Sequence, residues 1–111
     1  MSVPTETPQG LAARRGDVQI LDVREPAEWA AGHVEGSVHL ELNHLLAGAD
    51  PGLDPARPTV VVCRSGARSE LGTLLLVGRG HDAANLVGGL AAWAGAGLPL
   101  VADDGTAGRV L

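Results

Sequence analysis

Two short apolar runs constrain the fold of this chain more than any other feature. Residues 18–23 read Val-Gln-Ile-Leu-Asp-Val, and residues 59–62 read Thr-Val-Val-Val. Each run has the length of a strand and is rich in β-branched residues, which is typical of a strand buried on both faces. Such strands occur in parallel sheets that helices cover on both sides. We therefore expect an α/β domain of three layers, with a central sheet between helices.

The remaining elements are marked by weaker signals. Further strands are expected at residues 2–3, 38–40 and 84–87, so that the central sheet is mostly parallel and has five strands. Helices are expected where proline opens and glycine ends an apolar pattern, and their ranges are 9–15, 26–31, 43–47, 67–79 and 90–94.

The length of 111 residues fits one domain rather than two. We expect a single domain over residues 1–111, with a core of about 2–100 and a C-terminal tail at 101–111. Within that tail, residues 102–109 are small or polar and are expected to be solvated.

Charge and composition exclude several functions. The formal net charge is −5, which argues against a nucleic-acid partner because phosphate binding needs clustered cations. All basic residues are arginine, so chemistry through a lysine imine is excluded. No apolar run approaches a membrane span and the N-terminal residues do not resemble a signal peptide, so we expect no membrane partner and a cytoplasmic location.

The single cysteine, Cys63, can form neither an internal disulfide nor a zinc site of several thiolates. It follows the strand at 59–62 and precedes a helix, where free backbone amides and the helix dipole favour an anion. Gly66 lets the backbone curl, and Arg64 and Arg68 add permanent cations, so we expect a reactive thiolate. The alternative is a small buried apolar side chain, which a place inside the valine run would favour.

The stretch from Cys63 to Ser69, Cys-Arg-Ser-Gly-Ala-Arg-Ser, resembles the active-site loop of rhodanese-type sulfurtransferases. Residues 22–37, Asp-Val-Arg-Glu-Pro-Ala-Glu-Trp-Ala-Ala-Gly-His-Val-Glu-Gly-Ser, and residues 87–93, Val-Gly-Gly-Leu-Ala-Ala-Trp, resemble the same family in the same order. One departure is Glu35, where the family commonly has proline. The resemblance implies a rhodanese-like three-layer fold with a central parallel sheet.

The resemblance also implies a mechanism. Cys63 would be the catalytic nucleophile, taking a sulfur atom from thiosulfate or a related persulfide donor and passing it, as a persulfide, to cyanide or a thiol. The anionic donor would be bound by the loop residues Arg64, Ser65, Gly66, Ala67 and Arg68. No metal or organic cofactor is required, and a protein could serve as sulfur donor or acceptor.

Two alternatives stay open. The protein could be a slow or non-catalytic persulfide carrier or sensor that docks to a partner protein. Related phosphatases and arsenate reductases are less favoured, because they place an arginine six residues after the cysteine. Here Ser69 holds that position and Arg68 precedes it.

A group of polar residues is interpreted as structural support for the loop. We expect Asp22 to brace the cysteine loop from the neighbouring strand end and Arg24 to pair with Glu28, because charges at a strand end commonly form structural ion pairs. His33 resembles a structural histidine of the family rather than a base. The histidines form no compact ligand pattern, so we expect no metal.

Overall fold

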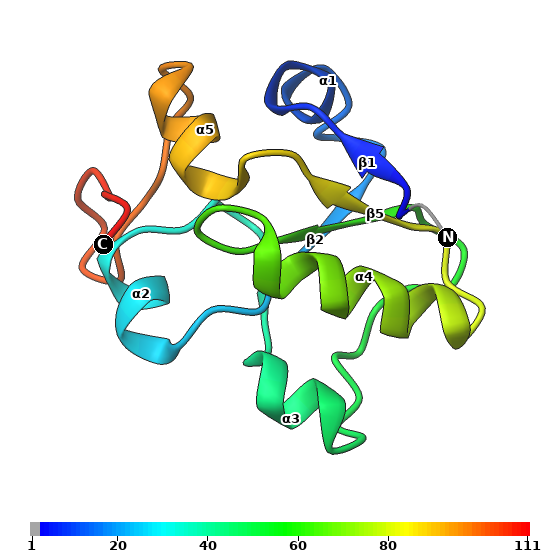
Figure 1. Cartoon of the computed structure of the whole chain (residues 1–111). Coiled ribbons are helices and arrows are strands. Elements are labelled where there is room, and N and C mark those ends of the chain that lie inside the picture. The colour runs from blue at the N-terminus through cyan, green and yellow to red at the C-terminus, as the bar shows by residue number, and fades with distance from the viewer. Residues whose placement is uncertain (1–2) are drawn as a thin grey trace.

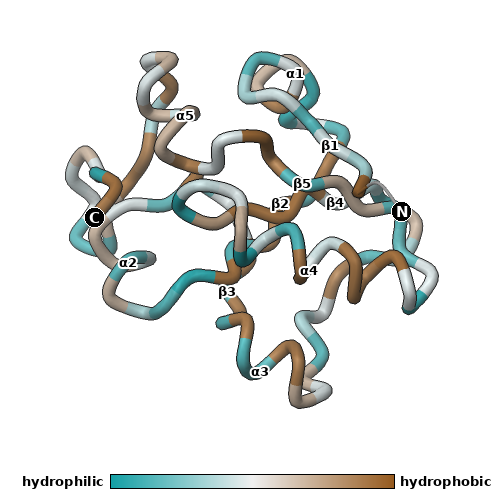
Figure 2. Tube along the Cα trace, viewed as in Figure 1, coloured by the Kyte–Doolittle hydropathy of each residue, from teal (hydrophilic) through white to brown (hydrophobic). Residues whose placement is uncertain are grey.

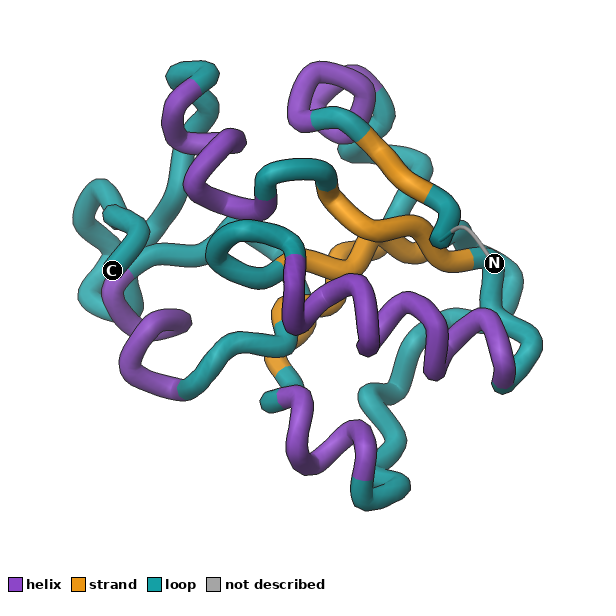
Figure 3. The backbone as a smooth tube through the Cα atoms, viewed as in Figure 1, coloured by secondary structure: helices purple, strands orange, loops and turns teal. Residues whose placement is uncertain are grey.

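The computed structural model of the chain describes residues 3–111, and helices and strands alternate along them (Figures 1 and 3). The strands are β1 (Thr5–Glu6), β2 (Gln19–Asp22), β3 (Val38–His39), β4 (Thr59–Val62) and β5 (Ala83–Leu86). The helices are α1 (Pro8–Ala13), α2 (Pro26–Ala31), α3 (Leu42–Leu46), α4 (Ala67–Gly78) and α5 (Gly89–Gly95). None of the helices within this range is long and apolar enough to cross a bilayer.

The strands form one five-stranded sheet in the order β1-β5-β4-β2-β3, and every pair is parallel. The predicted α/β fold with a five-stranded sheet is confirmed. Strand β4 lies at the centre, where Val61 pairs with Leu21 on one side and Asn85 on the other. Because the strands are parallel, the loops that leave β2, β4 and β5 emerge at the same edge of the sheet.

The core lies in two layers, one on each face of the sheet. Helices α1 and α5 cover one face, while α3 and α4 cover the other (Figure 1). Successive residues of β4 point to opposite layers: Val60 and Val62 pack in the first, and Val61 in the second. Both faces of the central strands are therefore buried, which explains their continuous apolar sequence (Figure 2).

The first strand lies elsewhere than predicted. Ser2 is outside the described residues, Val3 is in no strand, and β1 instead covers Thr5 and Glu6. Pro4 and Glu6 accept hydrogen bonds through their carbonyl oxygens from Asn85 N and Val87 N, at 2.8 and 2.9 Å. A two-residue edge strand whose polar side chains are exposed at Thr5 and partly exposed at Glu6 carries too little pattern to be recognised from sequence.

The C-terminal segment was expected to be solvated. Most of its side chains are exposed, but backbone hydrogen bonds attach it to the rest of the domain. Gly108 N donates to Leu100 O at 2.8 Å, and Arg109 N donates to Ala31 O at 2.9 Å. Gly108 approaches so closely that a Cβ there would lie 2.7 Å from Gly32 Cα. The segment is therefore anchored against the end of α2.

Candidate active site

Cys63 lies directly after β4, at the edge where the strands end, and is 1% exposed. Its Sγ accepts a hydrogen bond of 3.1 Å from the backbone amide of Gly66. Gly66 is the N-cap of α4 and has φ +109°, a conformation that residues with a Cβ rarely adopt. The turn therefore directs a backbone amide, and the positive end of the helix dipole, at the sulfur.

The first turn of α5 fixes the other side of the loop. Leu90 N donates to Cys63 O at 2.8 Å, and Ala91 N donates to Arg64 O at 2.9 Å. In a trans peptide the N–H points opposite to the preceding carbonyl, so the amides of Arg64 and Ser65 point away from α5. Gly89 permits this contact, because a Cβ there would lie 2.5 Å from Arg64 O. The segment after β5 therefore orients the amides of the cysteine loop.

Two residues that the sequence analysis did not assign to the site contact the cysteine loop. Ser69, which is fully buried, has its Oγ 3.2 Å from Cys63 Sγ and 2.6 Å from Asn85 Oδ1. Asn85 Nδ2 donates to Gly66 O at 3.1 Å. From the sequence, Ser69 was noted as the last residue of the stretch that resembles the active-site loop and as a marker of loop length, with no role in the site. Asn85 could have been noticed as a polar residue in an otherwise apolar strand, since such groups need buried partners.

Neutral donors, rather than arginines, are the largest of the influences that lower the pKa of the Cys63 thiol. Burial is the largest influence and raises the pKa of Cys63, but the Ser69 hydroxyl and the backbone amides of Ser69, Gly66 and Ser65 together lower it below its ordinary 9.0. Burial, which the sequence does not reveal for Cys63, opposes ionisation, and the hydrogen bonds outweigh it.

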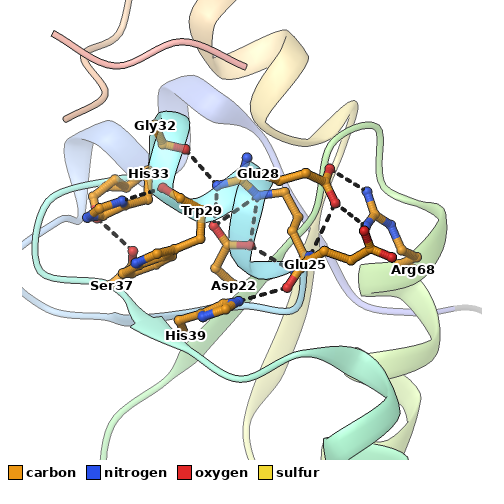
Figure 4. Close-up of polar contacts among 11 residues, drawn as sticks. Asp22, Glu25, Glu28, Trp29, Gly32, His33, Ser37, His39 and Arg68 are labelled. Carbon is orange, nitrogen blue, oxygen red and sulfur yellow. Dashed lines mark hydrogen bonds and ion pairs between the residues drawn. The ribbon is translucent and has the colours of Figure 1, made fainter. Parts of the chain in front are cut away.

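Arg68, predicted to bind the donor, is held by an acidic residue. Its Nη1 and Nη2 donate to the two carboxylate oxygens of Glu28 at 2.7 and 2.9 Å (Figure 4). This hydrogen bonding raises the pKa of Arg68, with a smaller contribution from the charge of Cys63, and the Arg68 side chain lowers the pKa of Glu28. Arg64, by contrast, is exposed and forms no ion pair within residues 3–111.

The predicted ion pair between Arg24 and Glu28 was wrong. Arg24 instead binds Asp22, with Nε 2.9 Å from Oδ1 and Nη2 2.7 Å from Oδ2, and both side chains are fully buried. The four-residue spacing from Arg24 to Glu28 has its usual meaning only inside a helix, and α2 begins at Pro26. Because Asp22 is occupied by Arg24, it does not brace the cysteine loop as expected.

His33, the remaining predicted support residue, packs on α2. Its Nδ1 lies 2.8 Å from Trp29 O, and its ring stacks on the Trp29 indole with centroids 3.7 Å apart (Figure 4). His39 also stacks on Trp29, at 4.9 Å, and its Nε2 lies 2.7 Å from Arg24 O. These contacts fix the loop between β2 and β3 and bring His33 no contact with Cys63 among the described residues.

The surface of the described residues is hollowed in at least two places. The larger, about 430 Å³, includes Trp93 and Val34 and none of residues 63–69. The smaller, about 210 Å³, includes Val23, Glu25 and Arg68, next to the cysteine loop. The smaller hollow is the one beside the candidate site, because Arg68 of its lining lies close to Cys63 in the sequence. Its size plays no part in this assignment.

A buried cysteine of lowered pKa, in a loop between a parallel strand and a helix, defines a site for nucleophilic group transfer. Comparison with known proteins agrees, since residues 7–96 match the family model for the rhodanese-like domain. The chain therefore belongs to the rhodanese-like family, and the resemblance seen in the sequence is confirmed.

Individual relatives support the same assignment. A protein of Allochromatium vinosum named sulfurtransferase is 40% identical over 90 residues, covering 80% of this chain and 83% of that protein. The thiosulfate sulfurtransferase GlpE of Pseudomonas fluorescens is 40% identical over 92 residues, covering 82% of each chain. Among solved structures, a rhodanese-related protein of Thermoplasma volcanium superposes with a TM-score of 0.83 at 26% identity, over 88% of this chain and 97% of that one.

Proposed function

We propose that the protein is a sulfurtransferase that takes a sulfane sulfur from thiosulfate and passes it to a thiophilic acceptor through a persulfide on Cys63. The observation that carries the proposal is the Sγ of Cys63, which receives hydrogen bonds from Gly66 N and Ser69 Oγ at the N-terminus of α4. The naming of relatives such as the Pseudomonas fluorescens protein supports thiosulfate as the donor.

In the first half-reaction, the Cys63 thiolate attacks the outer sulfur of thiosulfate. The bond between Sγ and that sulfur forms, the sulfur–sulfur bond of thiosulfate breaks, and its electron pair leaves with sulfite. No proton moves, so no general base is needed. The negative charge then lies on the terminal sulfur of the persulfide, where the amides of residues 64–68 act as an oxyanion hole does. The exposed Arg64 is suited to attract the sulfonate.

In the second half-reaction, an acceptor such as cyanide or a thiolate attacks the terminal sulfur. The persulfide bond breaks and its electron pair returns to Sγ, which regenerates the thiolate. Cys63 is the only cysteine, so no second thiol of the chain can take the sulfur and the acceptor comes from outside. Release of sulfite before the acceptor binds gives ping-pong kinetics.

The proposal is tested by sulfur transfer from thiosulfate to cyanide. Wild-type protein should produce thiocyanate and, with thiosulfate alone, gain the mass of one sulfur atom. Cys63→Ser keeps the size of the side chain and should do neither. Cys63→Ser with undiminished activity would overturn the proposal, as would a wild-type protein that gains no sulfur from any of thiosulfate, an inorganic polysulfide or a persulfide.

The ion pair of Arg68 and Glu28 favours considering a persulfide carrier as the second candidate. Because Glu28 neutralises Arg68, a free anionic donor gains less attraction than the sequence suggests. A carrier would load slowly from thiosulfate and rapidly from a protein persulfide. We place either activity in the cytoplasm, where thiols are kept reduced.

A further inference from the structure

We propose that the Ser69 hydroxyl is a switchable donor that follows the negative charge on Cys63 Sγ, while Asn85 takes its hydrogen bond whenever Sγ is neutral. Its part in turnover rests on the proposed function, whereas its effect on the thiol does not. Ser69 is then a catalytic residue, because it touches the reacting sulfur. Asn85 is a positioning residue that acts through Ser69.

The geometry gives Ser69 two acceptors for one proton. Its Oγ lies 2.6 Å from Asn85 Oδ1 and 3.2 Å from Cys63 Sγ, both hydrogen-bonding distances for those atoms. A hydroxyl donates one proton, so it serves one acceptor at a time. A thiolate is a strong acceptor and a neutral sulfur a weak one, so the charge on Sγ decides which acceptor receives the proton. Ser69 is fully buried, which excludes competition from bulk water.

Asn85 is fixed so that its oxygen faces Ser69. Its Nδ2 donates to Gly66 O at 3.1 Å, and its backbone lies in β5, paired with Val61 of β4. Turning the amide over would bring its oxygen against the carbonyl oxygen of Gly66 and leave Ser69 facing an NH₂ group. The side chain is 7% exposed, so water does not compensate for such a turn. Asn85 therefore offers Ser69 a permanent neutral acceptor.

Turnover moves charge on and off Sγ. Loading places the negative charge on the terminal sulfur and leaves Sγ neutral, so the Ser69 proton turns to Asn85. Unloading breaks the persulfide bond and returns the electron pair to Sγ, so the proton turns back. A donor that stabilises a thiolate makes it a better leaving group and a weaker nucleophile. Ser69 therefore assists unloading more than loading.

The charged groups around the sulfur do not perform this switch. Arg68, in the first turn of α4, interacts with the charge of Cys63, but its guanidinium is bound to Glu28 of α2 and also interacts with the charge of Glu25. The Asp22 and Arg24 side chains at the end of β2 are bound to each other. Among the described residues, the side chain that donates a hydrogen bond to Sγ is the neutral hydroxyl of Ser69.

The first test separates the two half-reactions in Ser69→Ala. Loading by thiosulfate and unloading by cyanide are each followed in single turnovers, at a pH where Cys63 is ionised in both proteins. In Ser69→Ala, the loading rate should be unchanged or should rise by up to about threefold for each unit by which the pKa of Cys63 increases. The unloading rate should fall by at least about threefold. Thr73→Val is the matched control, because it removes a buried hydroxyl one turn along α4 that donates to Ser69 O, at 2.7 Å, and has no hydrogen bond to Sγ among residues 3–111. Equal slowing of both half-reactions in Ser69→Ala would overturn the proposal.

The second test needs no sulfur transfer and so distinguishes failure of this inference from failure of the proposed function. The pH dependence of Cys63 alkylation by iodoacetamide should shift upward by about one pKa unit or more in Ser69→Ala. Asn85→Asp should also raise that pKa, because a carboxylate would retain the Ser69 proton and add negative charge. Gln9→Glu, an exposed substitution on α1 that adds the same charge on the other face of the sheet, is the control. Unshifted profiles in Ser69→Ala would contradict the inference, even if Asn85→Asp failed to fold.

Discussion

Arg68 and Glu28 form a two-bonded ion pair beside the cysteine loop, with nitrogen–oxygen distances of 2.7 and 2.9 Å. The pair joins the first turn of α4 to α2 (Figure 4). The side chains of Arg68 and Glu28 are 36% and 16% exposed, so the pair is screened on its Arg68 side. A cation that interacts with the charge of Cys63 is thus partly neutralised before any donor arrives. Glu28 therefore sets how much positive charge an anionic substrate meets.

Glu28→Gln should make the site more attractive to thiosulfate. Removing the carboxylate frees the Arg68 guanidinium, and we expect the KM for thiosulfate to fall by about 2- to 5-fold, which matches a partly exposed ion pair of up to about 1 kcal/mol. Steady-state kinetics at low ionic strength measure this. Glu6→Gln, which breaks the comparable 2.9 Å pair with Arg14, is the control and should leave KM unchanged. An equal fall of KM in both variants would show that net charge, rather than Arg68, is responsible.

The same ion pair should give a stability difference that depends on pH. The Arg68 hydrogen bonds hold the pKa of Glu28 below its ordinary 4.5. A carboxylate whose pKa is lower in the folded than in the unfolded protein stabilises the folded state. This stabilisation is complete at pH values above the unfolded-state pKa and is lost as the pH falls through the folded-state pKa. Urea unfolding should therefore show wild type more stable than Glu28→Gln near neutral pH, with a difference that shrinks below about pH 4.5. A constant difference across that range would contradict the ion pair as its source.

The central strands and the cysteine loop were readable from sequence because each is a local signal. The run at 59–62 became β4 with the same bounds, and Cys63 follows it as expected. The charges at the end of β2 were expected to form ion pairs, but the sequence did not show that Arg24 pairs with Asp22 of the strand end rather than with Glu28 of α2. The contacts of Asn85 depend on the order of the strands, because the pairing of β5 with β4 is what brings its side chain to Gly66 and Ser69. Contacts set by topology left no pattern along the chain.

Asp22→Ala should be among the most destabilising single substitutions in this chain. It leaves the fully buried Arg24 guanidinium without its counter-charge, which typically costs about 3–5 kcal/mol. Denaturant unfolding measures the loss, and Asp17→Ala, at an exposed acidic residue, is the control. Combining Asp22→Leu with Arg24→Met replaces both buried charges by apolar side chains and should recover much of the loss, because no isolated charge remains. A double variant as unstable as Asp22→Ala would show that packing, rather than charge, is what the pair provides.

Gly66→Ala and Gly80→Ala should separate the backbone role of a glycine from its role in the site. Both glycines have positive φ, +109° and +90°, so each substitution should destabilise the fold by about 1–2 kcal/mol. An added Cβ meets only ordinary contacts at Gly66, the nearest at 3.6 Å, and nothing within 4 Å at Gly80. Of the two, only Gly66 donates its amide to Sγ. Alanine keeps that N–H but strains the positive φ that aims it at the sulfur, so Gly66→Ala alone should raise the pKa of Cys63 and slow its alkylation at neutral pH. Alkylation rates that fall equally in the two variants, or in neither, would mean that the turn at Gly66 does not activate the thiol.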